Sequence, residues 1–287
     1  MQFMRLEMPS KKIESLNNAM LEVKHLKFVD LSGNNIVDPV ILQGFENLVH
    51  LNLNGNKVKS LSAFATEDGF PKLKKLELAS NKIGELTPIM VKSLEYFDIT
   101  DNKIEKYDTW NGHPTVRIFK AVDNRFKNLS VIKDMPNLQE AYLALNPITS
   151  FSGYDNVANL KMLHLRKTKI DKFEEELPEM ASIESINLRE TKISSLAGLK
   201  NIFQFGSLRN LNILETPLET EATSFNMLLA EIMILYRGLT RFCKVTITEQ
   251  HKYEGLFLSE YRWRKAEDER IRKENEEKQK VEGEGDS

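Results

Sequence analysis

A short motif recurs about ten times along most of the chain, and its spacing is the strongest constraint on the fold. The clearest copy runs from Leu48 to Val58 and reads L-x-x-L-x-L-x-x-N-x-V. Its leucines alternate with polar residues, His50 and Asn52, which is the period of a strand with one buried face. Asn56 follows, and its short amide can bond backbone groups that turn out of the strand and lack a ladder partner. Such a period predicts a stacked array of strands.

The copies keep their spacing from one end of the array to the other. A degenerate first copy at residues 3–13 is expected to cap the N-terminal end, and later copies follow at steps of 21 to 25 residues. They begin at Leu26, Leu48, Leu73, Leu94, Val116, Leu138, Leu160, Ile183 and Leu208. The turn position holds Asn34, Asn56, Asn81, Asn102, Asn124 and Asn146, then Thr168, Thr191 and Thr216. A threonine hydroxyl can make part of the bonds of the amide.

A second apolar series with a spacing of three closes each copy, as in Ile148 and Phe151. A step near 22 residues leaves room for short 3₁₀-like turns and not for full helices on the outer side. The repeats resemble leucine-rich repeats of the short intracellular kind, as in the phosphatase-regulatory subfamily. Over residues 1–219, this resemblance implies an α/β solenoid with a parallel sheet on its concave side.

Residues 220–248 are expected to form a C-terminal cap. Thr216-Pro217-Leu218 resembles the Asn-Pro-Leu sequence that closes the last repeat in this subfamily. Thr220 is predicted to cap a helix whose apolar face covers the end of the sheet. Leu239 and Phe242 are predicted to form a short final strand.

A charged helix is predicted over residues 249–280, with a disordered tail at 281–287. Thr246 to Glu249 fits a capping box for its start, and Gly255 is a point where it can break. Its beginning is apolar, and the rest carries carboxylate–cation pairs at i,i+4 spacing, such as Asp268 with Arg272. The helix is therefore either solvated or ordered by a partner.

Composition excludes several classes of partner. The net charge is −2 with 29% charged residues, so electrostatics predict neither nucleic acid nor a membrane as the main partner. A single cysteine, Cys243, rules out a disulfide framework and a thiolate zinc site. The N-terminus lacks the apolar core of a signal peptide, which favours a cytoplasmic, reducing compartment.

No pattern in the sequence predicts catalysis or a cofactor. Neither GxGxxG after a strand nor a P-loop is present, and the five histidines lack metal-ligand spacing. We therefore predict a protein that is not an enzyme. The alternative, an enzyme or small-molecule binder on the same scaffold, would need a deep pocket that a shallow curved sheet rarely supplies.

Strand alternation indicates which side chains face the hollow of the solenoid. The early copies are acidic there, the middle copies carry exposed apolar and aromatic residues, and the late copies are basic. Ten strands about 4.8 Å apart make a floor that fits a segment of a protein partner. The predicted partner-binding residues are Tyr96, Ile118, Lys120, Tyr142, Met162, His164, Arg166 and Arg189.

A more specific resemblance joins the array to its C-terminal end. The Pro217-Leu218 cap opening and the Glu- and Arg-rich helix over 261–280 are similar to the radial-spoke leucine-rich-repeat family of ciliary axonemes. That resemblance implies a structural protein in the cytoskeleton of the cilium, held in a larger complex with axonemal proteins. Other members of the repeat class regulate a protein phosphatase or bind a dynein motor domain, and these alternatives stay open.

Overall fold

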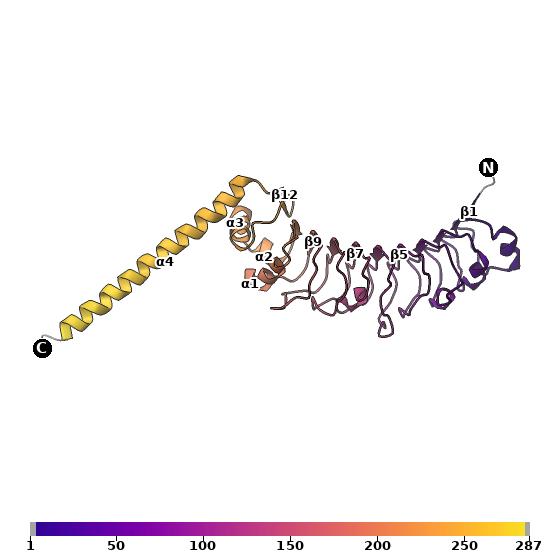
Figure 1. Cartoon of the computed structure of the whole chain (residues 1–287), viewed down its shortest axis with the longest axis horizontal. Coiled ribbons are helices and arrows are strands. Elements are labelled where there is room, and N and C mark those ends of the chain that lie inside the picture. The colour runs from indigo at the N-terminus through magenta and orange to yellow at the C-terminus, as the bar shows by residue number, and fades with distance from the viewer. Residues whose placement is uncertain (1–3, 285–287) are drawn as a thin grey trace.

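The computed structural model describes residues 4–284, with side chains described up to residue 276. Twelve strands form one sheet in sequential order, and they line the upper side of the solenoid in Figure 1. All neighbouring pairs are parallel except the last, which is antiparallel. The strands are β1 (Arg5–Glu7), β2 (Phe28–Asp30), β3 (His50–Asn52), β4 (Lys75–Glu77), β5 (Tyr96–Asp98), β6 (Ile118–Lys120), β7 (Glu140–Tyr142), β8 (Met162–His164), β9 (Ser185–Asn187), β10 (Asn210–Asn212), β11 (Arg241–Phe242) and β12 (Val245–Thr246). The predicted solenoid with a parallel sheet is confirmed.

Strands β3, β4 and β6 to β10 each have a buried central residue between two half-exposed ones, as the alternation predicts. The pairing keeps equivalent residues of successive copies side by side, so Leu51 lies opposite Leu76 and Phe97 opposite Phe119. Because every copy contributes its apolar residues to the same side, one continuous core runs along the array.

The asparagines form a buried ladder behind the sheet. The Asn56 amide donates to the backbone oxygens of Leu31 and Leu53, at 3.0 Å each, and its Oδ1 accepts from the Ile36 N–H at 3.0 Å. Leu31 and Ile36 belong to the preceding copy, so a single side chain ties two copies together. The predicted role of this residue is confirmed.

A column of left-handed backbone stands beside the ladder. The residue before each turn position has a positive φ, which costs little for Gly33 and Gly55 but is uncommon for other residues. The other members of the column are Ser10, Ser80, Asp101, Asp123, Leu145, Lys167, Glu190, Glu215 and, after β11, Cys243. This bend directs the chain away from the sheet at the same point of each copy.

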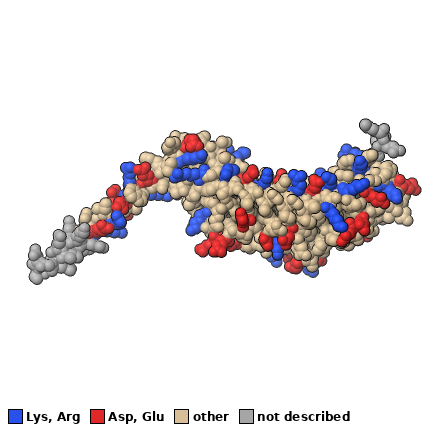
Figure 2. All heavy atoms as spheres, viewed as in Figure 1, with Lys and Arg blue, Asp and Glu red and all other residues tan. Residues whose placement is uncertain are grey.

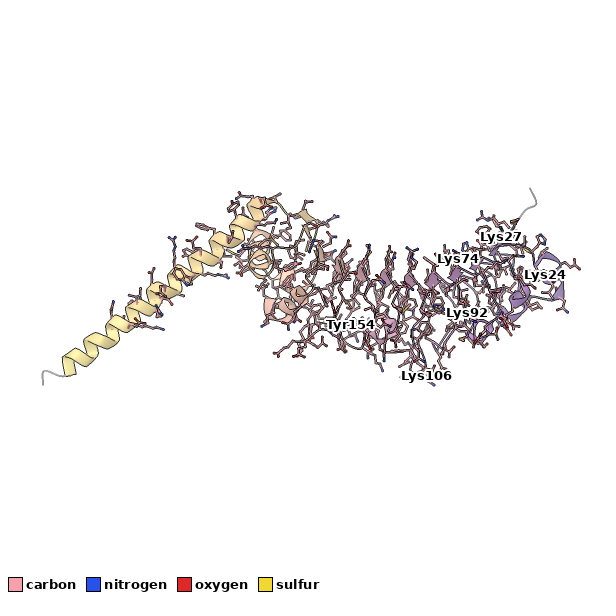
Figure 3. The ribbon with its side chains drawn as sticks, viewed as in Figure 1. Lys24, Lys27, Lys74, Lys92, Lys106 and Tyr154 are labelled. Atoms are coloured by element: carbon pink, nitrogen blue, oxygen red, sulfur yellow. The ribbon has the colours of Figure 1, made fainter. Side chains whose placement is uncertain are left out.

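The convex side consists of irregular chain and short helical turns, as expected for this repeat length. The turns are η1 (Asn18–Val23), η2 (Val40–Gly44), η3 (Ser62–Phe64), η4 (Leu129–Ile132), α1 (Leu196–Leu199) and η5 (Lys200–Gln204). Buried aromatic rings fill the space behind them, and Phe151 packs against Tyr154 and Phe173. Figure 3 shows Lys106 on this side, away from the strands.

The C-terminal cap begins with α2 (Pro217–Thr220), and Thr216 is its N-cap. The next helix, α3 (Phe225–Leu235), is capped by Ser224, so the prediction that Thr220 caps it is wrong. Thr220 instead ends α2, and its hydroxyl donates to the Thr216 carbonyl at 3.1 Å. The predicted final strand is found as β11, although β12, which closes a hairpin with it, was not predicted.

The last helix, α4, runs over Glu249–Glu284 and projects from the solenoid in Figure 1. The predicted capping box is wrong by two residues, because Thr246 lies in β12. Thr248 occupies the cap instead, and its backbone N–H donates to His251 Nδ1 at 3.1 Å. The break expected at Gly255 does not occur. The helix covers residues 281–284 of the segment expected to be disordered, and 285–287 lie outside the described residues.

Candidate partner-binding surface

All eight predicted partner-binding residues lie on the concave side, and each is half-buried. Six of them occupy adjacent positions on β5 to β8, since Tyr96 lies opposite Ile118, and Tyr142 lies between Lys120 and His164. Arg166 and Arg189 follow the ends of β8 and β9. The structure therefore brings together a central cluster of six residues and places the two arginines beside it.

Lys120 lies between two tyrosine rings at the centre of this floor. Its Nζ is 5.2 Å from the ring centroid of Tyr96 and 5.4 Å from that of Tyr142. Lys75 approaches Tyr96 from the other side at 4.8 Å. A cation over an aromatic face is held by the ring quadrupole, which restrains the long lysine side chains. We call Lys75, Tyr96, Lys120 and Tyr142 the concave ladder.

Polar contacts fix the two tyrosines further. The Tyr142 hydroxyl donates to Glu140 Oε2 at 2.6 Å, and its ring lies 4.8 Å from that of His164. Desolvation and the neighbouring carboxylates raise the pKa of Tyr96 and of Tyr142 to about 12. Both hydroxyls therefore stay protonated at neutral pH and act as donors, so the ladder presents a largely preformed surface.

The late part of the floor carries compensated charge, which corrects the expected basic zone. Arg166 Nη2 and Lys167 Nζ contact Glu190 at 2.6 and 3.1 Å, and Arg189 pairs with Glu215. Desolvation raises the pKa of Glu190, but hydrogen bonds from Lys167 and Arg166 leave this pKa below its ordinary value. Sequence reasoning missed the two glutamates because they stand outside the strands.

One carboxylate of the early acidic zone, Glu77, is compensated in the same way. Glu77 contacts the imidazole of His50, and Lys75 Nζ lies 3.0 Å from its Oε1. Desolvation raises the pKa of Glu77, but these two hydrogen bonds leave it lowered overall. Figure 2 shows Lys and Arg interspersed with Asp and Glu over the visible face of the solenoid. Glu77 in the early part of the floor and Glu190 in the late part are therefore both neutralised by neighbouring cations.

Leu145 is a residue of the surface that the sequence analysis missed. It lies in the left-handed column with φ 60° and its side chain is 45% exposed, where neighbouring copies carry Asp123 and Lys167. A large apolar side chain in this backbone conformation has a cost and gains no burial in the core. It stands three residues after Tyr142, just past the end of β7. The signal was available as a leucine at a position otherwise small or polar.

Two further titratable groups are buried away from the concave floor. Burial raises the pKa of the Cys243 thiol to about 11, and burial lowers the pKa of His113 to about 4. Among the side chains of residues 4–276, no group of three His, Cys, Asp or Glu residues is placed to hold a metal ion. Over residues 4–284 no helix is both long and apolar enough to cross a bilayer.

Comparisons with known proteins agree with this architecture. The family described as "Leucine Rich repeats (2 copies)" matches residues 24–66. Leucine-rich repeat-containing protein 23 of Bos taurus is 25% identical over 257 residues, which are 88% of this chain and 72% of the relative. Its Homo sapiens counterpart is 27% identical over 232 residues, so the match spans 80% of this chain and 65% of that relative.

Two solved structures share the fold at low identity. The TLR13–ssRNA13 complex superposes with a TM-score of 0.67 at 18% identity, over 84% of this chain and 36% of that one. The LRIM1/APL1C complex superposes with a TM-score of 0.62 at 18% identity, over 74% of this chain and 39% of that one. The chain therefore has the fold of a leucine-rich repeat solenoid, and its sequence is similar to that of leucine-rich repeat-containing protein 23.

Proposed function

We propose that the protein is a non-catalytic scaffold that binds another protein through its concave face, and that it serves as a structural component of a ciliary axoneme, in radial-spoke assembly or anchoring. One observation carries the binding site: the concave ladder is half-exposed and held in place before any partner arrives. Aromatic side chains and a cation that are already ordered lose little entropy on binding, which is typical of residues that dominate protein interfaces.

The axonemal part of the proposal has separate support. The resemblance to the radial-spoke family rests on the cap opening at Pro217-Leu218, which begins α2, and on the charged helix α4. The similarity to leucine-rich repeat-containing protein 23 extends over most of the chain. A floor of several adjacent strands suits a long contact with a protein segment better than it suits a small molecule.

The binding site is tested with Tyr142→Ala combined with Arg166→Ala. We expect retention of the tagged protein by detergent-extracted, salt-washed axonemes to fall at least about tenfold, since both removed side chains are interface anchors. The melting temperature should stay nearly unchanged because both side chains are partly exposed. Cross-linking read by mass spectrometry identifies the partner that is lost.

A matched control is Glu85→Ala with Lys106→Ala, two exposed residues outside the sheet. It should be retained like the parent protein. Equal retention of the concave variant would refute the concave site. Full extraction of the protein by detergent would refute the radial-spoke assignment. Co-purification with phosphatase activity or with a dynein motor domain would also refute it, and the concave site would then be tested with that partner.

A further inference from the structure

The first turns of α4 expose several large apolar side chains to solvent. Tyr253 is 66% exposed, Phe257 73% and Trp263 66%, and Leu256 and Tyr261 are exposed as well. Single exposed apolar residues are ordinary, but a contiguous group of this size marks an interaction site. These five residues, 253, 256, 257, 261 and 263, form what we call the aromatic face of α4.

The aromatic face has no part in attaching α4 to the fold. The opposite face makes that attachment through Gly255, where an added Cβ would come within 2.7 Å of Met233 Cβ and 3.1 Å of the Ala230 oxygen. Arg262 adds an ion pair to Glu231, with Nη1 2.8 Å from Oε2. Since folding already uses one side of the helix, the aromatic side needs another explanation.

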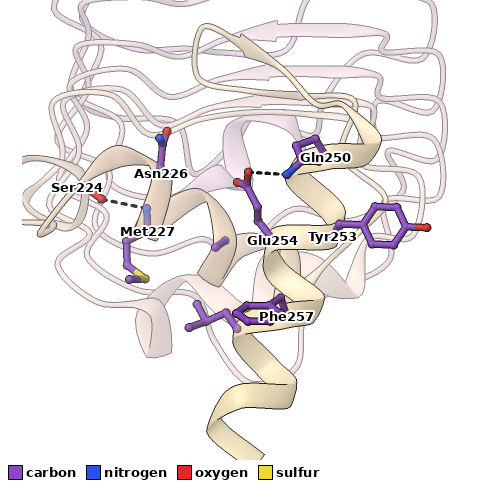
Figure 4. A pocket seen from close by; sticks show the side chains of 9 residues that line it. Ser224, Asn226, Met227, Gln250, Tyr253, Glu254 and Phe257 are labelled. Carbon is purple, nitrogen blue, oxygen red and sulfur yellow. Dashed lines mark hydrogen bonds between the residues drawn. The ribbon is translucent and has the colours of Figure 1, made fainter.

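Two hollows flank this face, and they share Tyr253 and Phe257. One, of about 620 Å³, lies between α3 and α4, and Met227 forms part of its wall (Figure 4). The other, of about 590 Å³, extends along α4 to Trp263. A ridge between two grooves is the relief that a second helix packs against.

The same side of α4 becomes acidic further along. Residues seven apart lie on nearly the same side of a helix, so the row that starts at Tyr253 continues through Glu260, Glu267 and Glu274. Around it lie Asp268, Arg264 and Arg270, which leaves four carboxylates against two guanidinium groups. The aromatic part, from residue 253 to 263, extends about 15 Å along the helix axis, and the acidic row, from 260 to 274, extends about 21 Å, at 1.5 Å per residue.

We propose that this side of α4 binds an amphipathic helix of another protein, with an apolar half over the aromatic face and a basic half over the carboxylates. The charge pattern disfavours a second copy of α4 as the occupant. Parallel copies would align Glu267 and Glu274 with their own duplicates, and antiparallel copies in full register would set carboxylates against aromatic rings. This surface is separate from the concave ladder, so the protein has two binding sites.

The probe is a synthetic helical peptide of about twenty residues, with leucines on one stripe of its first half and lysines on the same stripe of its second half. A charge-swapped peptide with glutamates in place of the lysines is the comparison. Trp263 serves as the reporter, because Trp110 is buried in the core and the chain has two tryptophans. We expect the lysine peptide to shift Trp263 emission to the blue and to bind at least about tenfold more tightly than the glutamate peptide.

Variants of the full chain locate the site. Phe257→Ser should weaken lysine-peptide binding at least about tenfold, since the ring is the most exposed anchor of the face. Asp268→Asn with Glu274→Gln should weaken it about threefold or more. Glu269→Gln with Glu276→Gln is the matched control, because it removes the same amount of charge from another side of α4. Each double variant also removes one i,i+4 ion pair, Arg270–Glu274 in the test and Arg272–Glu276 in the control. The control should change lysine-peptide binding less than twofold.

Three outcomes would overturn the proposal. The first is equal binding of the two peptides, or no effect of Phe257→Ser. The second is a dimer of the parent protein in light scattering that Phe257→Ser dissolves, which would make a second copy the occupant. The third is a Trp263 blue shift with phosphatidylcholine–phosphatidylserine vesicles but not with the peptide. Tyr142→Ala with Arg166→Ala should leave peptide binding unchanged, so this test is independent of the concave site.

Discussion

The two halves of the solenoid are joined differently. Up to Asn146 each turn position carries an amide that bonds its own copy and the preceding one. From Thr168 onward the hydroxyl donates to one carbonyl of its own copy, at 2.7 to 2.9 Å. Among the described residues no side-chain oxygen accepts from the N–H groups of Ile148, Ile170 or Ile193, which the missing amides would have satisfied.

The difference shows that the threonine half relies on other contacts between copies, namely its apolar core and its cap. Thr216 illustrates this, because its hydroxyl also accepts from the Glu219 N–H at 3.3 Å at the start of α2. A threonine therefore suits a position where the chain turns into a helix. We infer that the asparagine half gains its cohesion from polar bonds between copies and that the threonine half gains it from packing and capping.

The largest expected effect comes from breaking the asparagine ladder. Asn102 is buried and bonds the Leu78 and Ile99 oxygens and the Ile83 N–H, each at 3.0 Å. Asn102→Ala should lower the free energy of unfolding by about 3 kcal/mol, because several buried backbone groups lose their partner. Urea unfolding followed by circular dichroism measures the change. Thr191→Ala is the control and should cost about 1 kcal/mol, and equal losses would contradict the comparison.

A pH change offers a second way to weaken the asparagine half. Burial holds His113 neutral, with a pKa near 4, whereas the unfolded chain has the ordinary value of 6.5. Between pH 6.5 and 5 this imidazole is therefore protonated in the unfolded chain but not in the folded chain. The free energy of unfolding falls as the pH falls. The loss from pH 7 to 5 should be about 2 kcal/mol greater in the parent than in His113→Gln. His164 is half-exposed in the threonine half. The loss of stability from pH 7 to 5 should therefore differ less between the parent and His164→Gln than between the parent and His113→Gln. A larger difference for His164→Gln would reverse the interpretation.

The smallest effect is a gain. Thr191→Asn supplies the missing amide next to the Ile170 N–H, and we expect about 1 kcal/mol of added stability. The same urea titration measures it, with Thr191→Val, which supplies no amide, as the matched change. If Thr191→Asn is no more stable than the parent, adjacent copies in this half lie too far apart for one amide to bond both.

Much of the fold could be predicted because it repeats. One copy, such as Leu48 to Val58, is a weak signal, but nine steps in phase identify strand, turn and core residues together. The helix starts could not be placed in the same way, because Thr216, Thr220, Ser224, Thr246 and Thr248 are all able to cap a helix. Which of them does so depends on where β12 and the cap pack, and this is not a local property.

The candidate site was predictable in position and less so in character. Strand alternation placed Tyr96, Lys120 and Tyr142 correctly on the concave face. Their contacts with one another depend on the register between strands and on the reach of long side chains. The neutralising Glu190 lies outside the strand pattern, so its effect on Arg166 could not be read from that pattern.

The attachment of α4 has a consequence for assembly. Close approach at Gly255, the Arg262–Glu231 pair and a short β12 leave no flexible linker between the array and a helix that rises about 54 Å over its 36 residues. If one protein binds the concave face while another binds α4, the rigid chain between the two sites fixes the angle and the distance between the bound proteins. Where the two proteins belong to one assembly, binding of the first raises the effective concentration of the second at its site, so that two modest affinities combine into tight avidity.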